Sequence, residues 1–283
     1  LSDPRIKGVL FTGSCETANK IKKNLNKKEG EIIPLTAETG GINFMIIDSS
    51  ALTEQVVDDA IESGFYSAGQ RCSALRVLAI QEEVYEKTIK MLIGATKKIK
   101  VGLPYLLSTD IGPVIDQEAK DRINNHIQSF SSGKVLVKTP ISKENNGFYV
   151  SPTIIEIDNL FEVKEEIFGP VIHIYKYKAD KIEQLVSDIN KMNYGLTLGI
   201  QSRIENTINY IFNNANIGNI YINRNIVGAV VGVQPFGGRG LSGTGPKAGG
   251  PNYLMKFSNE KTYSYDTTAA GGNASLFMMS ENQ

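Results

Sequence analysis

The amino-acid sequence predicts an α/β fold with a mainly parallel sheet and flanking helices, and two observations lead to this prediction. Short apolar runs rich in Val and Ile alternate along the chain with amphipathic stretches of helical length. Strands joined through helices in this way form right-handed βαβ units, in which neighbouring strands are parallel. In addition, 283 residues of which 41% are hydrophobic and 21% are charged can bury a sizeable core.

The strands are expected at short runs of aliphatic and aromatic residues. They are residues 9–11, 32–33, 44–47, 76–80, 171–175, 196–201 and 220–222. The helices are expected where apolar residues recur every three or four positions, because that spacing places them on one face. They are residues 16–28, 53–65, 83–98, 116–130, 180–192 and 204–212.

Local signals refine this assignment at several places. Thr53 is a candidate N-cap, because its hydroxyl can accept a hydrogen bond from a free N–H group at a helix start. Asp180 and Glu183 have the spacing of a capping box. Glycine and proline are dense over residues 228–250, so this stretch is expected to be irregular. Residues 267–272 are small and polar and are expected to lie in a loosely held tail.

Charge and composition exclude several classes of function. Lys and Arg number 30 and so do Asp and Glu, so the net charge gives no reason to expect nucleic acid or an anionic membrane as a partner. No apolar run approaches the roughly 20 residues that span a bilayer, and no signal peptide opens the chain, so we expect a cytoplasmic protein. Two cysteines and two distant histidines, His126 and His173, indicate no metal site.

A glycine motif in the irregular stretch matches a dinucleotide-binding pattern only in its letters. Residues 238–243 read Gly-Arg-Gly-Leu-Ser-Gly, but Pro235 precedes them where a strand is needed. Pro246 follows where a Walker A motif needs lysine, and position 263, where the dinucleotide pattern needs an acidic residue, is Tyr. We therefore expect these glycines to make tight turns or to let the backbone approach a ligand.

Cys72 and Glu38 are the candidate reactive residues. Cys72 lies in a loop between a predicted helix and a predicted strand, and the adjacent Arg71 could favour its thiolate form. Glu38 ends a strand beside two glycines and could act as a general base. Each also has a structural interpretation, Cys72 as a buried inert thiol and Glu38 as a capping or salt-bridged carboxylate. Cys15 has no comparable setting and is interpreted as structural.

Five short motifs follow one another along most of the chain. They are residues 11–14 (Phe-Thr-Gly-Ser), 38–41 (Glu-Thr-Gly-Gly), 69–72 (Gly-Gln-Arg-Cys), 166–170 (Glu-Ile-Phe-Gly-Pro) and 235–238 (Pro-Phe-Gly-Gly). In type, order and spacing they resemble the C-terminal part of the NAD(P)-dependent aldehyde dehydrogenases. Residues 48–55, 67–76 and 223–238 are similar to the dehydrogenase half of the bifunctional proline-utilisation flavoproteins. That half oxidises L-glutamate γ-semialdehyde, the open form of pyrroline-5-carboxylate, to L-glutamate.

This resemblance implies a covalent mechanism in which NAD is the cofactor, with NADP left open. Cys72 would attack the aldehyde to form a thiohemiacetal, and Glu38 would later activate the water that hydrolyses a thioester. The positions that match the cofactor site are, for the pyrophosphate, Gly13 and Ser14 and, for the nicotinamide ribose and ring, Glu166 and Phe168. The positions that match the substrate site are Gly228 and Ala229 for the α-carboxylate, Ser73 for a further hydroxyl contact, and Phe236 for an aromatic wall.

The resemblance also implies a domain organisation. Residues 1–40 would be the remnant of a cofactor-binding domain, 41–241 the catalytic domain, and 242–283 a return segment with an oligomer contact and a flexible tail. Because the chain begins with Leu1, we expect a fragment of a longer protein. The absent region would supply the adenosine site and an oxyanion-hole asparagine, so the chain alone is expected to show little dehydrogenase activity.

The expected partners are a small-molecule aldehyde and either a second copy of the chain or an upstream proline dehydrogenase domain. Two other functions stay open at this point. The chain could be an aldehyde dehydrogenase of another substrate class, or an inactive truncated fragment that serves as a structural or interaction module.

Overall fold

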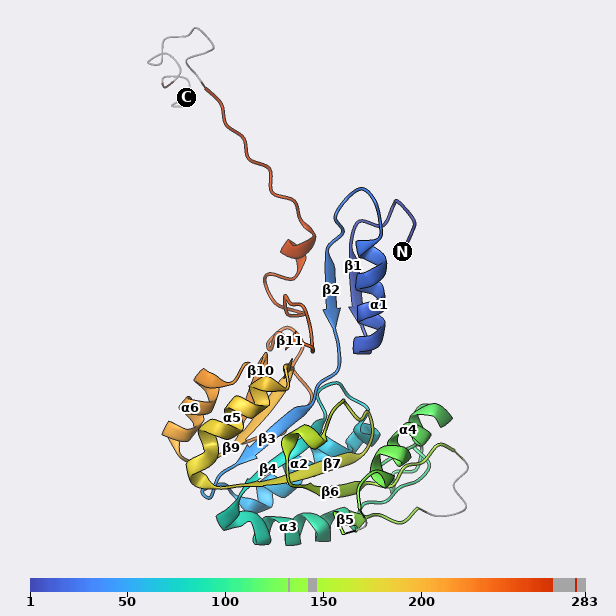
Figure 1. Ribbon diagram of the computed structural model, residues 1–283, viewed down its shortest axis with the longest axis vertical. Coiled ribbons are helices and arrows are strands. Elements are labelled where there is room, and N and C mark those ends of the chain that lie inside the picture. The colour runs from blue at the N-terminus through green and yellow to red at the C-terminus, as the bar shows by residue number, and fades with distance from the viewer. Residues whose placement is uncertain (132, 142–146, 267–277, 279–283) are drawn as a thin grey trace.

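The computed structural model describes residues 1–131, 133–141, 147–266 and 278. Figure 1 shows a large sheet covered by helices and, beside it, a smaller unit built from the first strands and helix. The predicted loosely held tail, residues 267–272, lies outside the described residues. Within the described part of the chain, no helix is both long enough and apolar enough to cross a lipid bilayer.

The large sheet has the strand order β10-β9-β3-β4-β7-β6-β5, and only the edge pair β5–β6 is antiparallel. Its strands are β3 (Asn43–Ile47), β4 (Leu75–Gln81), β5 (Val135–Lys138), β6 (Thr153–Ile157), β7 (Val171–Tyr177), β9 (Thr197–Gln201) and β10 (Asn219–Ile222). This mainly parallel sheet confirms the predicted fold class. Strands β3 and β4 are buried along their whole length, as expected for parallel strands with both faces covered.

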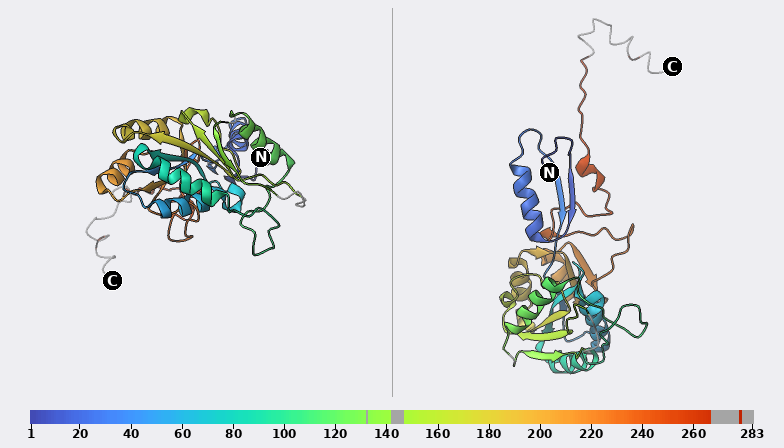
Figure 2. Two further views of the ribbon diagram at one scale, coloured as in Figure 1. Left: turned by 90° about the horizontal axis from the view of Figure 1, so that it is seen from below. Right: turned by 90° about the vertical axis from the view of Figure 1, so that its right-hand side faces the viewer.

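Helices cover both faces of the sheet and divide the core into two clusters (Figure 2). The helices are, on one face, α2 (Thr53–Phe65), α3 (Glu82–Thr96) and α4 (Gln117–Gln128) and, on the other, α5 (Ile182–Lys191) and α6 (Glu205–Asn214). Successive residues of β3 contribute to opposite clusters, Met45 to the first and Phe44 and Ile46 to the second. The central strands are therefore fixed from both sides, and the loops at their ends have a rigid base.

The smaller unit consists of α1 (Cys15–Asn26) and a parallel pair, β1 (Val9–Thr12) with β2 (Leu35–Glu38). The predicted strand at residues 32–33 is wrong, because Ile32 is 99% exposed and the strand begins after Pro34. The Val9 N–H donates to the Pro34 carbonyl at 2.9 Å, and the paired register continues from there to Glu38. Glu38 therefore ends a strand, as predicted from its motif.

Two predicted helix starts are also wrong. Thr53 is the first residue of α2 rather than its N-cap, and the N-cap position, Leu52, makes no side-chain hydrogen bond. Asp180 lies in a short 3-10 turn, Ala179–Lys181, and α5 begins after it without a capping box. The capping box occurs instead at Asn159 and Glu162. The Asn159 side chain accepts from a backbone N–H of the short turn that follows it, and the Glu162 side chain accepts from the backbone N–H of Asn159. Strands β5 and β6 were not predicted.

The glycine-rich stretch, residues 228–250, is mostly turns. Its one named strand, β11 (Arg239–Gly240), pairs antiparallel with β8 (Tyr194–Gly195). No helix opens after residues 238–243, so the glycines do not form a dinucleotide-binding turn of the strand-to-helix kind.

His173 is fully buried in strand β7 and pairs with the half-buried His126 of helix α4. Their Nε2 atoms are 2.8 Å apart, and Nδ1 of His173 is 2.9 Å from the Arg76 carbonyl oxygen. That oxygen can only accept, so His173 donates from Nδ1, and its Nε2 accepts from His126. Burial lowers the pKa of His173 to about 3 and also lowers the pKa of His126. Both rings are therefore neutral in the folded protein near neutral pH.

This buried pair predicts a loss of stability in mild acid. His173 stays neutral in the fold, while the unfolded chain takes up a proton below an ordinary pKa near 6.5. Its contribution is complete above that value and falls as the pH drops toward 3, by about 2 kcal/mol at pH 5. Urea unfolding at pH 7.5 and pH 5 measures this difference. In the His173→Phe variant the pH-dependent loss should shrink by about that amount, and an unchanged loss would contradict the assignment.

Candidate active site

Three loops meet at one edge of the large sheet, the edge where strands β3, β4 and β7 begin. The segment after Glu38 enters β3, the loop that carries Cys72 enters β4, and the loop that carries Glu166 enters β7. Because β3, β4 and β7 are adjacent and parallel, the residues before them gather at the same edge. Three of the five ordered motifs of the sequence thus supply neighbouring loops at this edge.

The Cys72 loop follows a tight left-handed turn. Ser67, Ala68 and Gly69 all have positive φ angles, of 58°, 54° and 64°. A Cβ atom on Gly69 would lie 2.1 Å from the Gly169 carbonyl oxygen, so only glycine fits here. The nucleophile loop therefore touches the backbone that follows Phe168 without any intervening side chain.

Asn43 fixes the other end of the Cys72 loop. Its Nδ2 atom donates to the carbonyl oxygens of Cys72, at 2.7 Å, and Ala74, at 2.8 Å. Its Oδ1 atom accepts from the Thr197 N–H at 3.1 Å, so the buried amide is fully engaged. Asn43 was not predicted to belong to the site, although an amide at the start of an otherwise apolar strand is a signal that could have indicated it.

The Cys72 thiol lies in an environment that disfavours its charged form. Burial raises its pKa above the ordinary value, and the nearby carboxyl groups of Glu166 and Glu38 raise it further, while the Ser73 N–H opposes them. The expectation that Arg71 favours the thiolate is not met. Arg71 is exposed and its Nε donates to the Ser67 hydroxyl at 3.1 Å. The electrostatic effect of Glu38 on Cys72 shows that the two candidate groups are close enough to interact.

Glu38 lies against the glycine-rich turn. Its Oε2 accepts from the Gly238 N–H at 2.8 Å, and its Oε1 is buried without a partner among the described residues. Cβ atoms on Gly237 and Gly243 would lie 2.8 Å and 3.0 Å from Oε1. The glycines of residues 238–243 thus let the backbone approach a carboxylate.

The same surroundings tune the acidity of Glu38. Burial raises its pKa from 4.5 to about 7, against the opposing effects of the Gly238 N–H and the Lys247 charge. The Lys247 Nζ donates to the Gly218 carbonyl oxygen and, at 2.9 Å, to Asn219 Oδ1. A carboxyl group with a pKa near neutrality is suited to general base chemistry.

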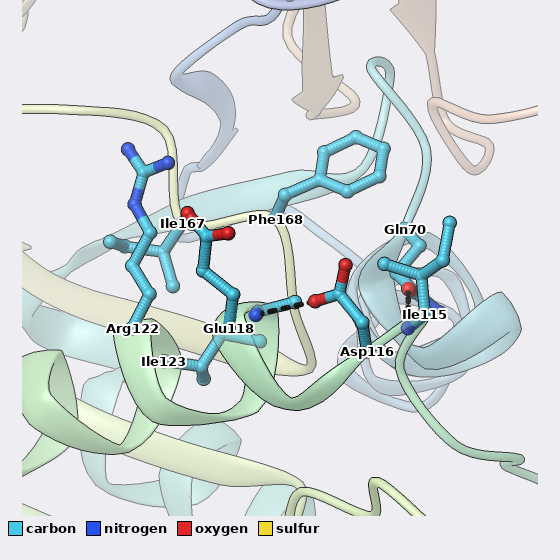
Figure 3. A pocket seen from close by; sticks show the side chains of 9 residues that line it. Gln70, Ile115, Asp116, Glu118, Arg122, Ile123, Ile167 and Phe168 are labelled. Atoms are coloured by element: carbon cyan, nitrogen blue, oxygen red, sulfur yellow. Dashed lines mark hydrogen bonds between the residues drawn. The ribbon is translucent and has the colours of Figure 1, made fainter.

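Glu166 and Phe168 form the third side of this edge. Glu166 Oε1 accepts from the Gly41 N–H at 3.2 Å and lies 3.6 Å from the Arg76 guanidinium. The Phe168 ring is 44% exposed and lies beside a cavity of about 270 Å³. Figure 3 shows the ring above that cavity, with Arg122 at its other end. An exposed aromatic ring beside a cavity can stack on a flat ligand.

Gly13 and Ser14 connect the smaller unit to this edge. The Gly13 N–H donates to the Glu38 carbonyl at 3.1 Å. Ser14 is the N-cap of α1, and its hydroxyl accepts from the Thr17 N–H at 3.1 Å. The positive end of the α1 dipole is thus adjacent to the segment that ends in Glu38.

A comparison with protein-family models identifies the family of this chain. The aldehyde dehydrogenase family model matches residues 1–263. The chain belongs to the aldehyde dehydrogenase family. It is 52% identical over 270 residues to the bifunctional protein PutA of Klebsiella aerogenes, covering 92% of this chain and 21% of that protein. It is 36% identical to a 1-pyrroline-5-carboxylate dehydrogenase of Geobacillus sp. (strain WCH70), covering 92% of this chain and 51% of that enzyme.

Solved structures of aldehyde dehydrogenases agree with this assignment. A crystal structure of proline utilization A (PutA) from Bradyrhizobium japonicum, a mutant, is 49% identical with a TM-score of 0.90, covering 95% of this chain and 27% of that one. A 1-pyrroline-5-carboxylate dehydrogenase from Thermus with bound NAD is 29% identical with a TM-score of 0.81, covering 90% and 50%. The chain thus spans about a fifth to a quarter of the PutA proteins and half of the single-function dehydrogenases.

The four residues that match the substrate site of aldehyde dehydrogenases lie in three different settings. Ser73 is buried and follows Cys72 directly. Phe236 is half-buried and exchanges two backbone hydrogen bonds with Ala248 in the glycine-rich turn. Gly228 and Ala229 lie in an open loop, where Gly228 has a φ of 73°. Among the bonds that the structure defines within its described range, none joins this loop to Cys72 or Glu38.

Proposed function

We propose that the chain is the catalytic part of an NAD-dependent aldehyde dehydrogenase that oxidises L-glutamate γ-semialdehyde to L-glutamate. The observation that carries the proposal is the meeting of Cys72 and Glu38 at one sheet edge, where the Glu38 charge contributes to the raised pKa of the Cys72 thiol. A nucleophilic thiol beside a carboxyl group of near-neutral pKa fits acyl transfer to water. The names of the PutA and 1-pyrroline-5-carboxylate dehydrogenase relatives support the substrate.

The residues at the site fit a nicotinamide cofactor. A Cβ on Gly40 would lie 1.8 Å from Glu166 Oε2, so glycine leaves room for a carboxylate that can accept from ribose hydroxyls. Phe168 offers an exposed ring beside the cavity, and the start of α1 behind Gly13 and Ser14 favours an anion. When bound, NAD would supply the acceptor for the hydride. The Thermus relative with bound NAD supports this choice over NADP.

The first chemical role belongs to Cys72. Its sulfur forms a bond to the aldehyde carbon, and the carbonyl oxygen becomes the oxyanion of a thiohemiacetal. Because burial and two carboxyl groups raise its pKa, the thiol must give up its proton as the attack occurs. Glu38, as a carboxylate, can accept that proton directly or through a water molecule.

The second role belongs to Glu38 once the thiohemiacetal has been oxidised to a thioester. The carboxylate removes a proton from water, the water oxygen bonds to the acyl carbon, and the carbon–sulfur bond breaks. The product acid leaves and the Cys72 thiol is restored. The backbone turn around Gly238 holds the carboxylate through Oε2, while Oε1 makes no hydrogen bond among the described residues.

A substrate panel tests the proposed substrate class. The chain would be joined to the preceding half of a 1-pyrroline-5-carboxylate dehydrogenase relative, and NAD reduction would be measured with the semialdehyde and with simple aliphatic aldehydes. We expect the highest kcat/KM for L-glutamate γ-semialdehyde. A higher kcat/KM for simple aldehydes would instead indicate an aldehyde dehydrogenase of another substrate class.

Thiol labelling tests whether the chain has retained reactive chemistry. We expect an aldehyde-mimicking electrophile to modify Cys72 faster than Cys15, whose Sγ lies 3.2 Å from the Leu241 carbonyl oxygen. Equally slow labelling of the two thiols would favour an inactive structural module. Labelling requires no cofactor, so its outcome is independent of the substrate panel.

The Gly228 loop gives a prediction about specificity. If its N–H groups bind the α-carboxylate, Gly228→Val should raise the KM for the semialdehyde about tenfold, because a β-branched residue strains a φ of 73°. The KM for simple aldehydes should stay unchanged. Gly232→Val is the matched control, since Gly232 has a φ of 80° and open space around it, like Gly228. Equal effects of Gly228→Val on both substrates would contradict the assignment.

A further inference from the structure

Arg76 is a fully buried arginine that contacts two of the loops of the site. Its Nη2 donates to the carbonyl oxygens of Gly69, at 2.8 Å, and Arg71, at 3.2 Å, which belong to the Cys72 loop. Its Nη1 donates to the Gly169 carbonyl oxygen at 3.0 Å, in the loop that follows Glu166. A single guanidinium group therefore binds both loops.

The same side chain also reaches the third segment through Glu166. The Arg76 Nη2 lies 3.6 Å from Glu166 Oε1, which in turn accepts from the Gly41 N–H. Gly41 follows the general base Glu38 by three positions. The ion pair between Arg76 and Glu166 thus links three segments: the one that follows Glu38, the Cys72 loop and the loop that carries Phe168.

The positive charge of Arg76 lies in an unusual place, inside a fully buried strand. Arg76 is the second residue of β4, whose seven residues are all buried, and its Nε has no partner within the described residues. Burial of an arginine is unfavourable unless its other N–H groups are bound, and here the four contacts above serve that purpose. The backbone is held as well, because the Arg76 carbonyl oxygen accepts from His173 Nδ1.

The Arg76 guanidinium lies close to Cys72, because it binds the carbonyl oxygen of Arg71, the residue directly before the cysteine. Burial lowers the pKa of Arg76, while the Glu166 carboxylate and, to a smaller extent, the Cys72 charge oppose that shift. Around the thiol, Glu166 and Glu38 contribute negative charge. Arg76 is the buried cation that opposes them, since a guanidinium group stays protonated throughout the working pH range.

We propose that Arg76 is a positioning residue that holds the Cys72 loop against the Glu166–Gly169 loop and favours the thiolate form of Cys72. The catalytic meaning of this arrangement rests on the proposed function. Arg71, one position before the cysteine, does not share the role, because its side chain is exposed and donates to the Ser67 hydroxyl.

The experiment measures alkylation of Cys72 by iodoacetamide as a function of pH in the 283-residue chain. Cys15→Ser removes the second thiol from every variant. We expect Arg76→Met to lower the alkylation rate at pH 7 about tenfold and to move the rate profile about one pH unit upward, since a lost cation destabilises the thiolate. Arg76→Lys keeps the charge and should restore most of the rate. Arg71→Met, the matched control, should change the rate less than twofold.

Hydrogen exchange of the backbone amides measures the positioning role and also controls for misfolding. In Arg76→Met, the amides of residues 66–73 and 166–169 should exchange faster, while those of β3 and β7 should keep their protection. If β3 and β7 also lose protection in Arg76→Met, that variant is misfolded, and the alkylation rate of Arg76→Lys is the test instead. Failure of Arg76→Lys to restore the alkylation rate would overturn the proposal. An equal loss of rate in Arg71→Met and Arg76→Met would also overturn it.

These readouts separate the inference from the proposed function. If Cys72 of the unaltered chain reacts no faster than Cys15, the proposed function fails whatever Arg76 does. If Cys72 is reactive but indifferent to Arg76→Met, the inference fails and the proposed function stands.

Discussion

Replacing Cys72 by alanine is expected to abolish acyl transfer by the chain. With p-nitrophenyl acetate, the Cys72 sulfur would displace nitrophenolate to form a thioester, a reaction that needs no cofactor. The alanine variant should show no burst of nitrophenolate, and its steady rate should fall at least about 10³-fold toward the uncatalysed rate. Stopped-flow absorbance measures both quantities.

Cys15→Ala is the control for this experiment. Cys15 is half-buried like Cys72, but it is the first residue of α1 and belongs to none of the three loops of the site. The burst should stay at about one nitrophenolate per chain in this variant. A burst that is lost with Cys15 and kept without Cys72 would exclude Cys72 as the nucleophile.

Replacing Glu38 by glutamine is expected to separate the two halves of the same reaction. The burst should remain, because Cys72 is intact, while the steady rate should fall about 10²- to 10⁴-fold, since nothing removes the proton from the attacking water. In the unaltered chain, the steady rate should rise with pH along a titration curve whose midpoint is near pH 7, because only the carboxylate form of Glu38 is a base.

A control variant and the pH profile of the steady rate both test the role of Glu38. Glu165→Gln is the matched control, since Glu165 is exposed and pairs with Arg122 at 2.8 Å. It should leave both the burst and the steady rate unchanged. If the steady rate of Glu38→Gln kept the midpoint near 7, another group would be the base.

The fold was predictable where burial is complete. The residues of β3, β4 and β7 are mostly apolar because helices cover both faces of the sheet, and such runs stand out in a sequence. Strands β5 and β6 were not predictable, since their antiparallel pair lies at the sheet edge and its register shifts between Val135 and Val137. The strand at residues 32–33 failed because two isoleucines resemble a strand, but nothing covers Ile32.

The motif residues of the site were predictable, but the contacts that tune them were not. Cys72 and Glu38 could be chosen from their motifs, yet the pKa of Glu38 depends on a bond to Gly238, which lies 200 positions away. Arg76 was counted only as a strand residue, since its sequence neighbours are apolar and its partners come from separate loops. Arg71 was favoured as the cation because it is adjacent in sequence, although proximity along the chain does not set the direction of a side chain.

The bond between Glu38 and Gly238 has a consequence for the order in which this protein acquires its chemistry. A ribosome completes the Cys72 loop long before it adds the glycine turn, so a nascent chain shorter than residue 238 has a thiol without a seated base. During synthesis such a chain could be acylated but would release its acyl group slowly.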